Sequence, residues 1–297
     1  MNNCLTILTP TYNRAIKLKK LYHSLICQSN MNFIWFVMDD GSEDNTEKLI
    51  HDFMEEGKLE ILYSKKKNGG KHTALNAAMP QLESELVFIV DSDDFLAEDA
   101  VELICKYHDK YRHTTGLCGY SFLRTISNYE YLTTGRLPAD EFIDTFVNCR
   151  INQNIPEDMA EVWYTTCLKR HPFPEFHEEK FLAEDVVWLK MSGPNKLVFI
   201  NKAIYYCEYL DDGLTRNRRK NNIDSPQGCV LRAKLFLEAD IKARYTIKPA
   251  LQYVIYGFFA KYKIARLFHE SPRKLWFVLA FLPACILFFV WRTRLNK

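Results

Sequence analysis

Three aspartates that follow a strongly apolar stretch are the residues best placed for chemistry. Asp91, Asp93 and Asp94 come directly after residues 86–90, five apolar residues typical of a strand buried on both faces of a parallel sheet. Two carboxylates about 4 Å apart repel by roughly 4 kcal/mol at an effective dielectric constant near 20, so proteins gather them mainly to hold a cation or to shift a pKa. Ligands of open α/β sheets bind beyond the carboxyl ends of strands. We therefore predict a divalent metal ion holding a phosphate at this turn.

The first hundred residues predict the framework that carries these aspartates. Apolar runs predict strands at 4–8, 33–38, 59–63 and 86–90. Helical patterns lie between them, one of them ending at Gly57, and this alternation predicts right-handed crossovers and a mostly parallel sheet. Polar or acidic residues end the first, second and fourth strands. We expect these strand ends to lie at one edge of the sheet, where a nucleotide would bind.

The second half of the chain follows a less regular pattern. It predicts a helix near 97–112, a strand at 116–124 and, within 178–191, a helix start that carries Glu184 and Asp185. Two further short strands are predicted at 197–200 and 203–207. The basic loop at 216–220 is either a site for phosphate or a membrane surface, or a solvated turn.

The C-terminal tail has two segments of membrane-binding type. Residues 250–268 predict an amphipathic basic helix, and residues 275–291 contain no charge and have basic residues on both sides. As a helix, the second segment spans about 26 Å, slightly less than a hydrocarbon core of roughly 30 Å. Pro283 predicts a kink, and Trp276 and Trp291 suit headgroup depth. We predict membrane contact, with spanning and interfacial placement both open.

Composition excludes several other classes of protein. The chain has 297 residues and a net charge of +2, which gives no reason to expect nucleic acid as a partner. Its nine cysteines are scattered without a CxxC pair, which argues against a zinc site and a secreted disulfide framework and favours a cytosolic compartment. Because Pro10 ends the first apolar stretch early, a signal peptide is not expected.

Familiar phosphate and metal motifs do not fit. Gly70-Lys71 lacks the earlier glycine and the Ser/Thr of a P-loop, and Phe95 and Leu96 break the EF-hand pattern that begins at Asp91. Two alternatives stay open at this point: a phosphatase with Asp91 as its nucleophile, and a non-catalytic nucleotide-binding scaffold at a membrane.

Five short motifs taken in order resemble those of the inverting family 2 glycosyltransferases. They are TPTYNR at 9–14, DDGSED at 39–44, NGGK at 68–71, DSDD at 91–94 and ED at 184–185, and the resemblance covers roughly residues 4–210. It implies an α/β protein of the GT-A fold, in which a Rossmann-like nucleotide half is joined to an acceptor half. The chain looks most like bacterial enzymes that build capsular or other surface polysaccharides.

The resemblance also implies an organisation of the chain and a reaction. A glycosyltransferase domain is expected over 1–245, with a nucleotide-sugar half at 1–115 and an acceptor half at 116–245, followed by a membrane-associating tail at 246–297. The donor would be a UDP-sugar and the acceptor a saccharide, expected to be lipid-linked. The enzyme would then work at the cytoplasmic face of the bacterial membrane.

Roles in nucleotide binding transfer to two of the motifs. Pro10, Thr11 and Tyr12 match residues that line the base. Asp40, with Asp39 beside it, matches an acceptor of a hydrogen bond from uracil.

The next two motifs match the diphosphate and metal site. Lys71 lies where the family often has a basic residue near the base or the diphosphate. Asp91 and Ser92 match donor-binding positions, and Asp91 and Asp93 match the ligands of Mn²⁺ or Mg²⁺. Asp94 is either a supporting neighbour of that site or a helix N-cap.

The last motif matches the catalytic pair. Asp185 would be the general base, preceded by Glu184. A positioned base that takes the proton of the acceptor hydroxyl contributes about 10²–10⁴-fold. The leaving diphosphate gains negative charge, which a bound metal ion neutralises. A single displacement inverts the anomeric configuration, so no enzyme nucleophile is needed.

Overall fold

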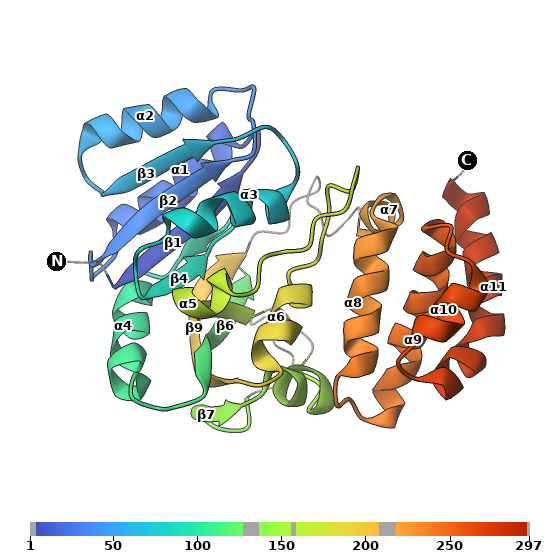
Figure 1. The fold of residues 1–297 in the computed structure, drawn as a ribbon. Helices are drawn as coiled ribbons and strands as arrows, with labels where there is room; N and C mark the ends of the chain where they lie inside the picture. Colours follow the sequence, from blue (N-terminus) through green and yellow to red (C-terminus); the bar gives the residue numbers. More distant parts are fainter. Residues whose placement is uncertain (1–3, 127–136, 156–158, 208–217, 296–297) are drawn as a thin grey trace.

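A computed structural model describes residues 4–126, 137–155, 159–207 and 218–295 (Figure 1). Within these residues, nine strands form one sheet in the order β3-β2-β1-β4-β8-β6-β9-β5, with β7 paired to β9. The strands are β1 (Leu5–Thr11), β2 (Phe33–Asp39), β3 (Ile61–Lys65), β4 (Leu86–Ile89), β5 (Phe95–Leu96), β6 (Leu117–Ile126), β7 (Glu141–Asp144), β8 (Met159–Tyr164) and β9 (Lys196–Cys207). The sheet runs without a break from the N-terminal half into the second half.

The first four strands are all parallel, as the sequence predicts. β1 pairs with β2 from Leu5↔Phe33 to Thr11↔Asp39, and β4 lies on the other side of β1. Alternate residues face opposite cores, with Ile7 in one apolar cluster and Leu8 in the other. Because both faces are covered, the strands read as continuous apolar runs. Their carboxyl ends therefore lie together at one edge of the sheet.

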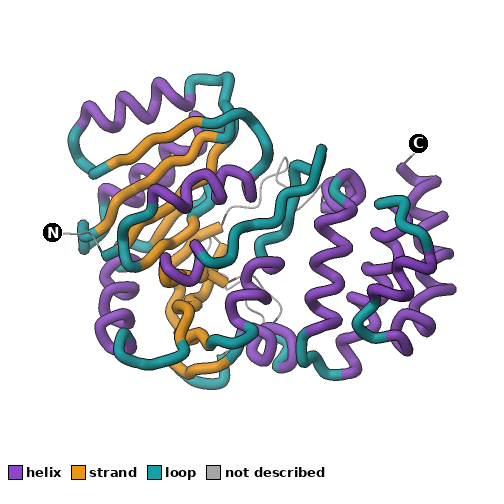
Figure 2. The backbone as a smooth tube through the Cα atoms, viewed as in Figure 1, coloured by secondary structure: helices purple, strands orange, loops and turns teal. Residues whose placement is uncertain are grey.

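Helices cover both faces of the sheet and continue beyond it (Figure 2). The α-helices are α1 (Ala15–Ile26), α2 (Thr46–Glu56), α3 (Lys71–Ala78), α4 (Ala100–Tyr111), α5 (Thr165–Lys169), α6 (Asp185–Ser192), α7 (Arg218–Asp224), α8 (Pro226–Glu238), α9 (Ala243–Phe259), α10 (Ile264–Glu270) and α11 (Lys274–Leu295). α2 ends at Gly57, whose φ of 64° is left-handed, as expected of a glycine that follows a helix.

Two predicted elements differ from the structure. The short strands predicted at 197–200 and 203–207 are one strand, β9, which pairs with both β6 and β7. Asp94 is not a helix N-cap, because β5 intervenes and Asp99 holds the N-cap position of α4. Short apolar runs indicate which residues are buried. Whether two such runs form one strand or two depends on the strands that pair with them.

The C-terminal helices form a layer of their own beside the sheet (Figure 1). The helix predicted over 250–268 is instead two helices, α9 and α10, separated by a turn at Lys261, where φ is 58°. Val254 and Ile255 of α9 are buried in an apolar cluster that α8 and α11 share. The apolar side of α9 is therefore a protein contact and does not face a membrane. The predicted basic loop at 216–220 lies partly outside the described residues, and α7 begins at Arg218.

Candidate active site

The turn after β4 presents two accessible carboxylates and one buried one. The side chains of Asp91 and Asp93 are 31% and 23% exposed, whereas Asp94 is buried and accepts a hydrogen bond of 2.7 Å from the Tyr205 hydroxyl. Burial and the neighbouring charge of Asp91 raise the pKa of Asp93, and they raise the pKa of Asp94 to about 7. Asp91 and Asp93 are therefore the pair that a ligand can reach.

Lysine 71 joins this turn to the second predicted acidic motif. Its ammonium forms an ion pair with Asp91 and lies 2.8 Å from a carboxylate oxygen of Glu184. Burial disfavours the charged form of Asp91, but the positive charges of Lys71, Arg124 and Arg14 together outweigh burial and hold the pKa of Asp91 below its ordinary value. Three motifs that are far apart in the sequence thus converge on one nitrogen.

A second cation meets the turn from the first predicted motif. Arg14 lies immediately before α1, and its guanidinium is 3.4 Å from a carboxylate oxygen of Asp93. Arg124, at the end of β6, packs over the ring of Tyr205 at 4.2 Å and lowers the pKa of Asp91 through its charge. Arginines and a lysine therefore surround the acidic turn, an arrangement that suits an anionic ligand held together with a cation.

Asp185 is held by an arginine from a distant helix. Both carboxylate oxygens accept from Nε of Arg232 in α8, at 2.6 and 2.8 Å, and Nη2 donates to the same group. The two side chains are about one-fifth exposed, and the guanidinium packs over the ring of Phe236 at 4.8 Å. Burial opposes the charge of Arg232, but Asp185 raises the pKa of Arg232 above its usual value. This bidentate pair fixes the orientation of the Asp185 carboxylate.

The Asp39–Asp40 pair is buried and bonded to the surrounding chain. Asp40 accepts from the backbone N–H groups of Gly69 and Gly70, at 3.0 and 2.7 Å, and from the ammonium of Lys66 at 2.9 Å. Asp39 accepts from the Tyr63 hydroxyl at 2.8 Å. The Asp40 carboxylate therefore holds the loop at 68–71 in place, and the Asp39 carboxylate is bound to β3 through Tyr63.

Glycine is required in that loop for two reasons. Gly70 has a φ of 98°, which L side chains rarely adopt, and a Cβ there would lie 2.1 Å from the carbonyl oxygen of Lys180. Asn68 also accepts a hydrogen bond of 2.7 Å from the Lys180 ammonium. The loop therefore packs directly on the segment that leads to α6, and this contact places Lys71 beside Glu184.

The residues predicted to line the base lie at the end of β1. Pro10 and Thr11 are buried in the strand, and Tyr12 is 43% exposed just beyond it. Ser92 is also buried. Tyr12 is therefore the member of this predicted set whose ring is available to a ligand.

The acidic turn fits a hard divalent cation, although it supplies only part of a coordination shell. In the described parts of the chain, no three His, Cys, Asp or Glu side chains come together at metal-binding spacing. Asp91 and Asp93 offer carboxylate oxygens, the donors that Mg²⁺ and Mn²⁺ prefer. Mg²⁺ commonly binds through one or two carboxylates and completes its shell with phosphates and water. The donor set thus suits a metal ion that arrives with a diphosphate.

Sequence reasoning missed the cations that contact these acids. Arg14 lies in the first motif but has no predicted role there, and Arg232 belongs to no motif; nor does Tyr205, whose hydroxyl donates to Asp94. Their contacts depend on the packing of α8 and β9 onto the sheet. No local pattern in the sequence carries that information.

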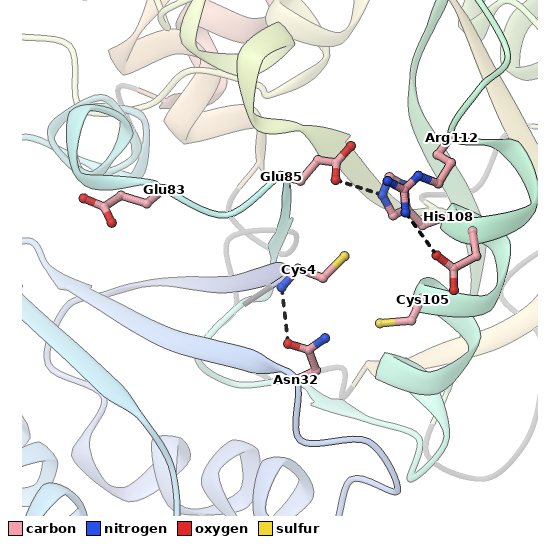
Figure 3. Close-up of a pocket in the computed structure, with 8 residues that line it drawn as sticks. Cys4, Asn32, Glu83, Glu85, Cys105, His108 and Arg112 are labelled. Carbon is pink, nitrogen blue, oxygen red and sulfur yellow. Dashed lines mark hydrogen bonds and ion pairs between the residues drawn. The ribbon is translucent and has the colours of Figure 1, made fainter. Parts of the chain in front are cut away.

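A cavity among the described residues lies away from this site (Figure 3). It has a volume of about 460 Å³ and lies at the starts of β1 and β4, where Cys4, Glu85, Cys105 and His108 line it. His108 Nε2 is 3.2 Å from Glu85. Because this is the end of the strands opposite to Asp91, the cavity is not part of the candidate active site.

Comparisons with known proteins agree on the type of protein. The family model for glycosyl transferase family 2 matches residues 6–154. Glycosyltransferase GlyA of Streptococcus pneumoniae serotype 4 is 26% identical over 226 residues, and the match covers 71% of this chain and 31% of GlyA. The minor teichoic acid biosynthesis protein GgaB of Bacillus subtilis strain 168 is 22% identical over 218 residues, covering 70% of this chain and 23% of GgaB. The chain thus spans about a third or less of the length of these relatives.

Solved structures show the same fold. The structure of Staphylococcus aureus TarS 1–349 in complex with UDP-GlcNAc has a TM-score of 0.66 and 21% identity, covering 90% of this chain and 81% of that one. The mannosyltransferase PcManGT of Pyrobaculum calidifontis, solved with GDP-Man and Mn²⁺, has a TM-score of 0.57 and 16% identity, covering 99% of this chain and 81% of that one. The predicted GT-A fold is confirmed, and the chain belongs to glycosyl transferase family 2.

Proposed function

We propose that this chain transfers a sugar from a nucleotide sugar to a hydroxyl group of a saccharide acceptor, with inversion at the anomeric carbon. One observation carries the proposal: Lys71 bridges Asp91, at the end of the nucleotide half, to Glu184, which precedes Asp185. Groups able to hold a diphosphate therefore lie next to a carboxylate able to take a proton. Family membership removes the support for the phosphatase alternative.

The donor is a UDP-sugar in this proposal. Pro10, Thr11 and Tyr12 line the base, and the exposed ring of Tyr12 supports this role. Asp40 shapes the base site through the loop that it holds, with Asp39 beside it, and an oxygen of Asp40 accepts a hydrogen bond from uracil. The TarS structure, solved with UDP-GlcNAc, supports the choice of a uridine nucleotide.

The diphosphate binds at the acidic turn together with Mn²⁺ or Mg²⁺, held by Asp91 and Asp93 beside Ser92. The bound ion supplies charge neutralisation as the nucleoside diphosphate leaves. Lys71, Arg14 and Arg124 contribute positive charge to the same place. The PcManGT structure, which contains Mn²⁺, supports a divalent metal ion.

Asp185 acts as the general base, and Glu184 orients Lys71 beside it. Arg232 holds the Asp185 carboxylate in a fixed orientation, and one of the two carboxylate oxygens must be released to accept the proton of the acceptor hydroxyl. Proximity of donor and acceptor then allows direct displacement at the anomeric carbon. No covalent intermediate with the enzyme is required.

The acceptor is a lipid-linked saccharide of surface polysaccharide synthesis, used at the cytoplasmic face of the membrane. The similarity to GgaB, a minor teichoic acid biosynthesis protein, supports this class of product. In this proposal residues 1–115 bind the donor, residues 116–245 bind the acceptor, and the tail at 246–297 contacts the membrane through α11.

The decisive test is donor binding by the purified chain. We expect the melting temperature to rise with UDP-sugars in the presence of Mn²⁺, and to rise much less with Mn²⁺ removed or in the Asp93→Asn variant. Glu98→Gln is the matched control, since this acidic residue follows the turn without belonging to it. A chain that is not stabilised by any nucleotide sugar, with or without metal, would contradict the proposal.

A further inference from the structure

Helix α11 uses one side for protein packing and leaves the other side uncovered. Phe277, Ala280 and Ala284 are buried on one side of the helix. Aromatic contacts continue along that side, from Phe277 against Tyr253 of α9 to Trp291 against Tyr256 at 6.1 Å. The contact with α9 therefore runs along most of the length of α11.

The uncovered side is apolar from end to end. Its exposed large side chains recur three, four or seven residues apart, so they form one stripe along the helix. They are Leu275 (68% exposed), Val278 (59%), Leu279 (53%), Leu282 (71%), Ile286 (66%) and Phe289 (60%). A continuous exposed stripe of this kind marks an interaction site, because soluble proteins seldom leave one uncovered. We call these six residues the α11 stripe.

Positive charge lies at both ends of the α11 stripe. Lys274 is exposed at its start, and Arg292 and Arg294 are exposed at its end, where Arg219 of α7 also lies over the ring of Trp291. Between residues 261 and 295 the sequence has seven lysines and arginines and a single acidic residue, Glu270. This distribution complements an anionic surface.

We propose that α11 lies in the plane of an anionic bilayer, with the α11 stripe among the upper acyl chains and its basic ends among the lipid headgroups. This inference deepens the membrane contact in the proposed function and rests on it. An in-plane helix of this type combines an apolar stripe with cationic residues at headgroup depth.

The packing argues against α11 crossing the bilayer. Within the described residues α11 is the one helix that is long and apolar enough to span. However, α10 is attached beside it through Phe268 and Phe277, whose rings lie 5.5 Å apart, and α10 is preceded by exposed Lys261 and Lys263. Insertion of α11 across the membrane would carry these charges into hydrocarbon or break the contact with α9.

The charge distribution also argues against a second copy of this chain as the occupant. An antiparallel pair of α11 helices would bring Lys274 of one copy towards Arg292 and Arg294 of the other. Like charges would then meet at both ends of the interface, which costs binding free energy. Anionic lipid satisfies the same cations.

The helix that bears the α11 stripe is connected to the candidate active site through packed helices. α11 packs on α9, α9 packs on α8, and α8 carries Arg232 to Asp185 at the start of α6. Figure 1 shows these helices side by side between the sheet and the outer face of α11. A docked α11 would hold the site at a fixed height above the lipid, where a lipid-linked acceptor is found.

The test uses flotation of the full chain with vesicles of phosphatidylcholine, alone or mixed with phosphatidylglycerol. We expect flotation with the anionic vesicles and roughly a tenfold or greater loss of it in the Leu282→Glu/Ile286→Glu variant, because two charges enter the stripe. Leu62→Glu is the matched control, since Leu62 is 42% exposed on β3, far from α11. Unchanged flotation of the double variant, or no flotation of the wild-type chain, would overturn the proposal.

Two further measurements separate the alternatives. Extraction of the vesicles with alkaline carbonate should release an in-plane helix, whereas retention would show that α11 spans. Light scattering without lipid should show a monomer, and a dimer that the double variant dissociates would identify a second copy as the occupant instead. The double variant should still be stabilised by UDP-sugar with Mn²⁺, so failure of the membrane inference and failure of the proposed function can be told apart.

Discussion

Two acidic pairs, Asp39–Asp40 and Glu184–Asp185, look alike in the sequence but are held in opposite ways. The first pair is buried, and its oxygens accept from backbone and side-chain donors of nearby segments. The second pair is partly exposed, and each of its members faces one cation supplied by a distant segment, Lys71 or Arg232. The first pair builds the site, and the second pair is available to react.

The difference lies in how easily each carboxylate can change partners. Backbone N–H groups such as those of Gly69 and Gly70 cannot turn away without unfolding the loop. Long cationic side chains such as Lys71 and Arg232 can move by rotating about single bonds. A base must be freed during each reaction cycle, so side-chain partners suit Asp185 and backbone partners suit Asp40.

The largest expected effect is on stability, and it comes from removing Asp40, a member of the buried pair. Asp40→Ala leaves the N–H groups of residues 69 and 70 without an acceptor and removes the anionic partner of Lys66, and should lower the free energy of unfolding by about 3–5 kcal/mol. Asp185→Ala should cost only about 1 kcal/mol, because that pair is partly exposed. Urea denaturation of both variants measures this difference, and equal losses would contradict the distinction.

The next largest effect is expected at Lys71, the cation that contacts both Asp91 and Glu184. Lys71→Met leaves the carboxylates of Asp91 and Glu184 facing each other without compensation. We expect the kcat/KM for sugar transfer to fall on the order of 10²-fold, with part of the loss recovered at high Mn²⁺ concentration. Lys67→Met is the control, because Lys67 is an exposed lysine nearby that is not a partner in this ion pair. A normal kcat/KM would show that the bridge is not used.

A smaller effect is expected at the partner of Asp185. Arg232→Met frees the carboxylate to rotate, so kcat should fall roughly tenfold while the affinity for the donor is unchanged. Arg232→Lys, which keeps the charge but loses the bidentate geometry, should restore part of kcat. Steady-state kinetics of the two variants measure these changes. A rise in kcat in Arg232→Met would show instead that Arg232 limits the ability of Asp185 to act as a base.

The sequence predicted the parts of the fold that depend on local patterns. The apolar runs that became β1, β2, β3 and β4 were each recognisable, and parallel pairing followed from the alternation with helices. Because parallel strands end at one edge, the polar residues at their ends, Asp39 and Asp91 among them, could be placed together from the sequence alone. Gly57 was recognisable as a helix stop by its backbone freedom.

Features set by long-range packing were not predictable. Whether 197–207 is one strand depended on β6 and β7, and whether the apolar side of α9 faces lipid depended on α8 and α11 covering it. Arg232 reaches Asp185 because of how α8 packs on α6, which no motif encodes. The exposure of the α11 stripe likewise became visible only once its opposite side was seen to be buried.

The central claim is tested most directly by Asp185→Asn, which keeps the size of the side chain and removes its basicity. Calorimetry with UDP and Mn²⁺ and a sugar-transfer assay should be run on the same preparation. We predict an unchanged affinity for UDP and a loss of transfer of about 10²–10⁴-fold. Transfer at the wild-type rate, or a loss of UDP binding together with transfer, would contradict the role of Asp185 as the base.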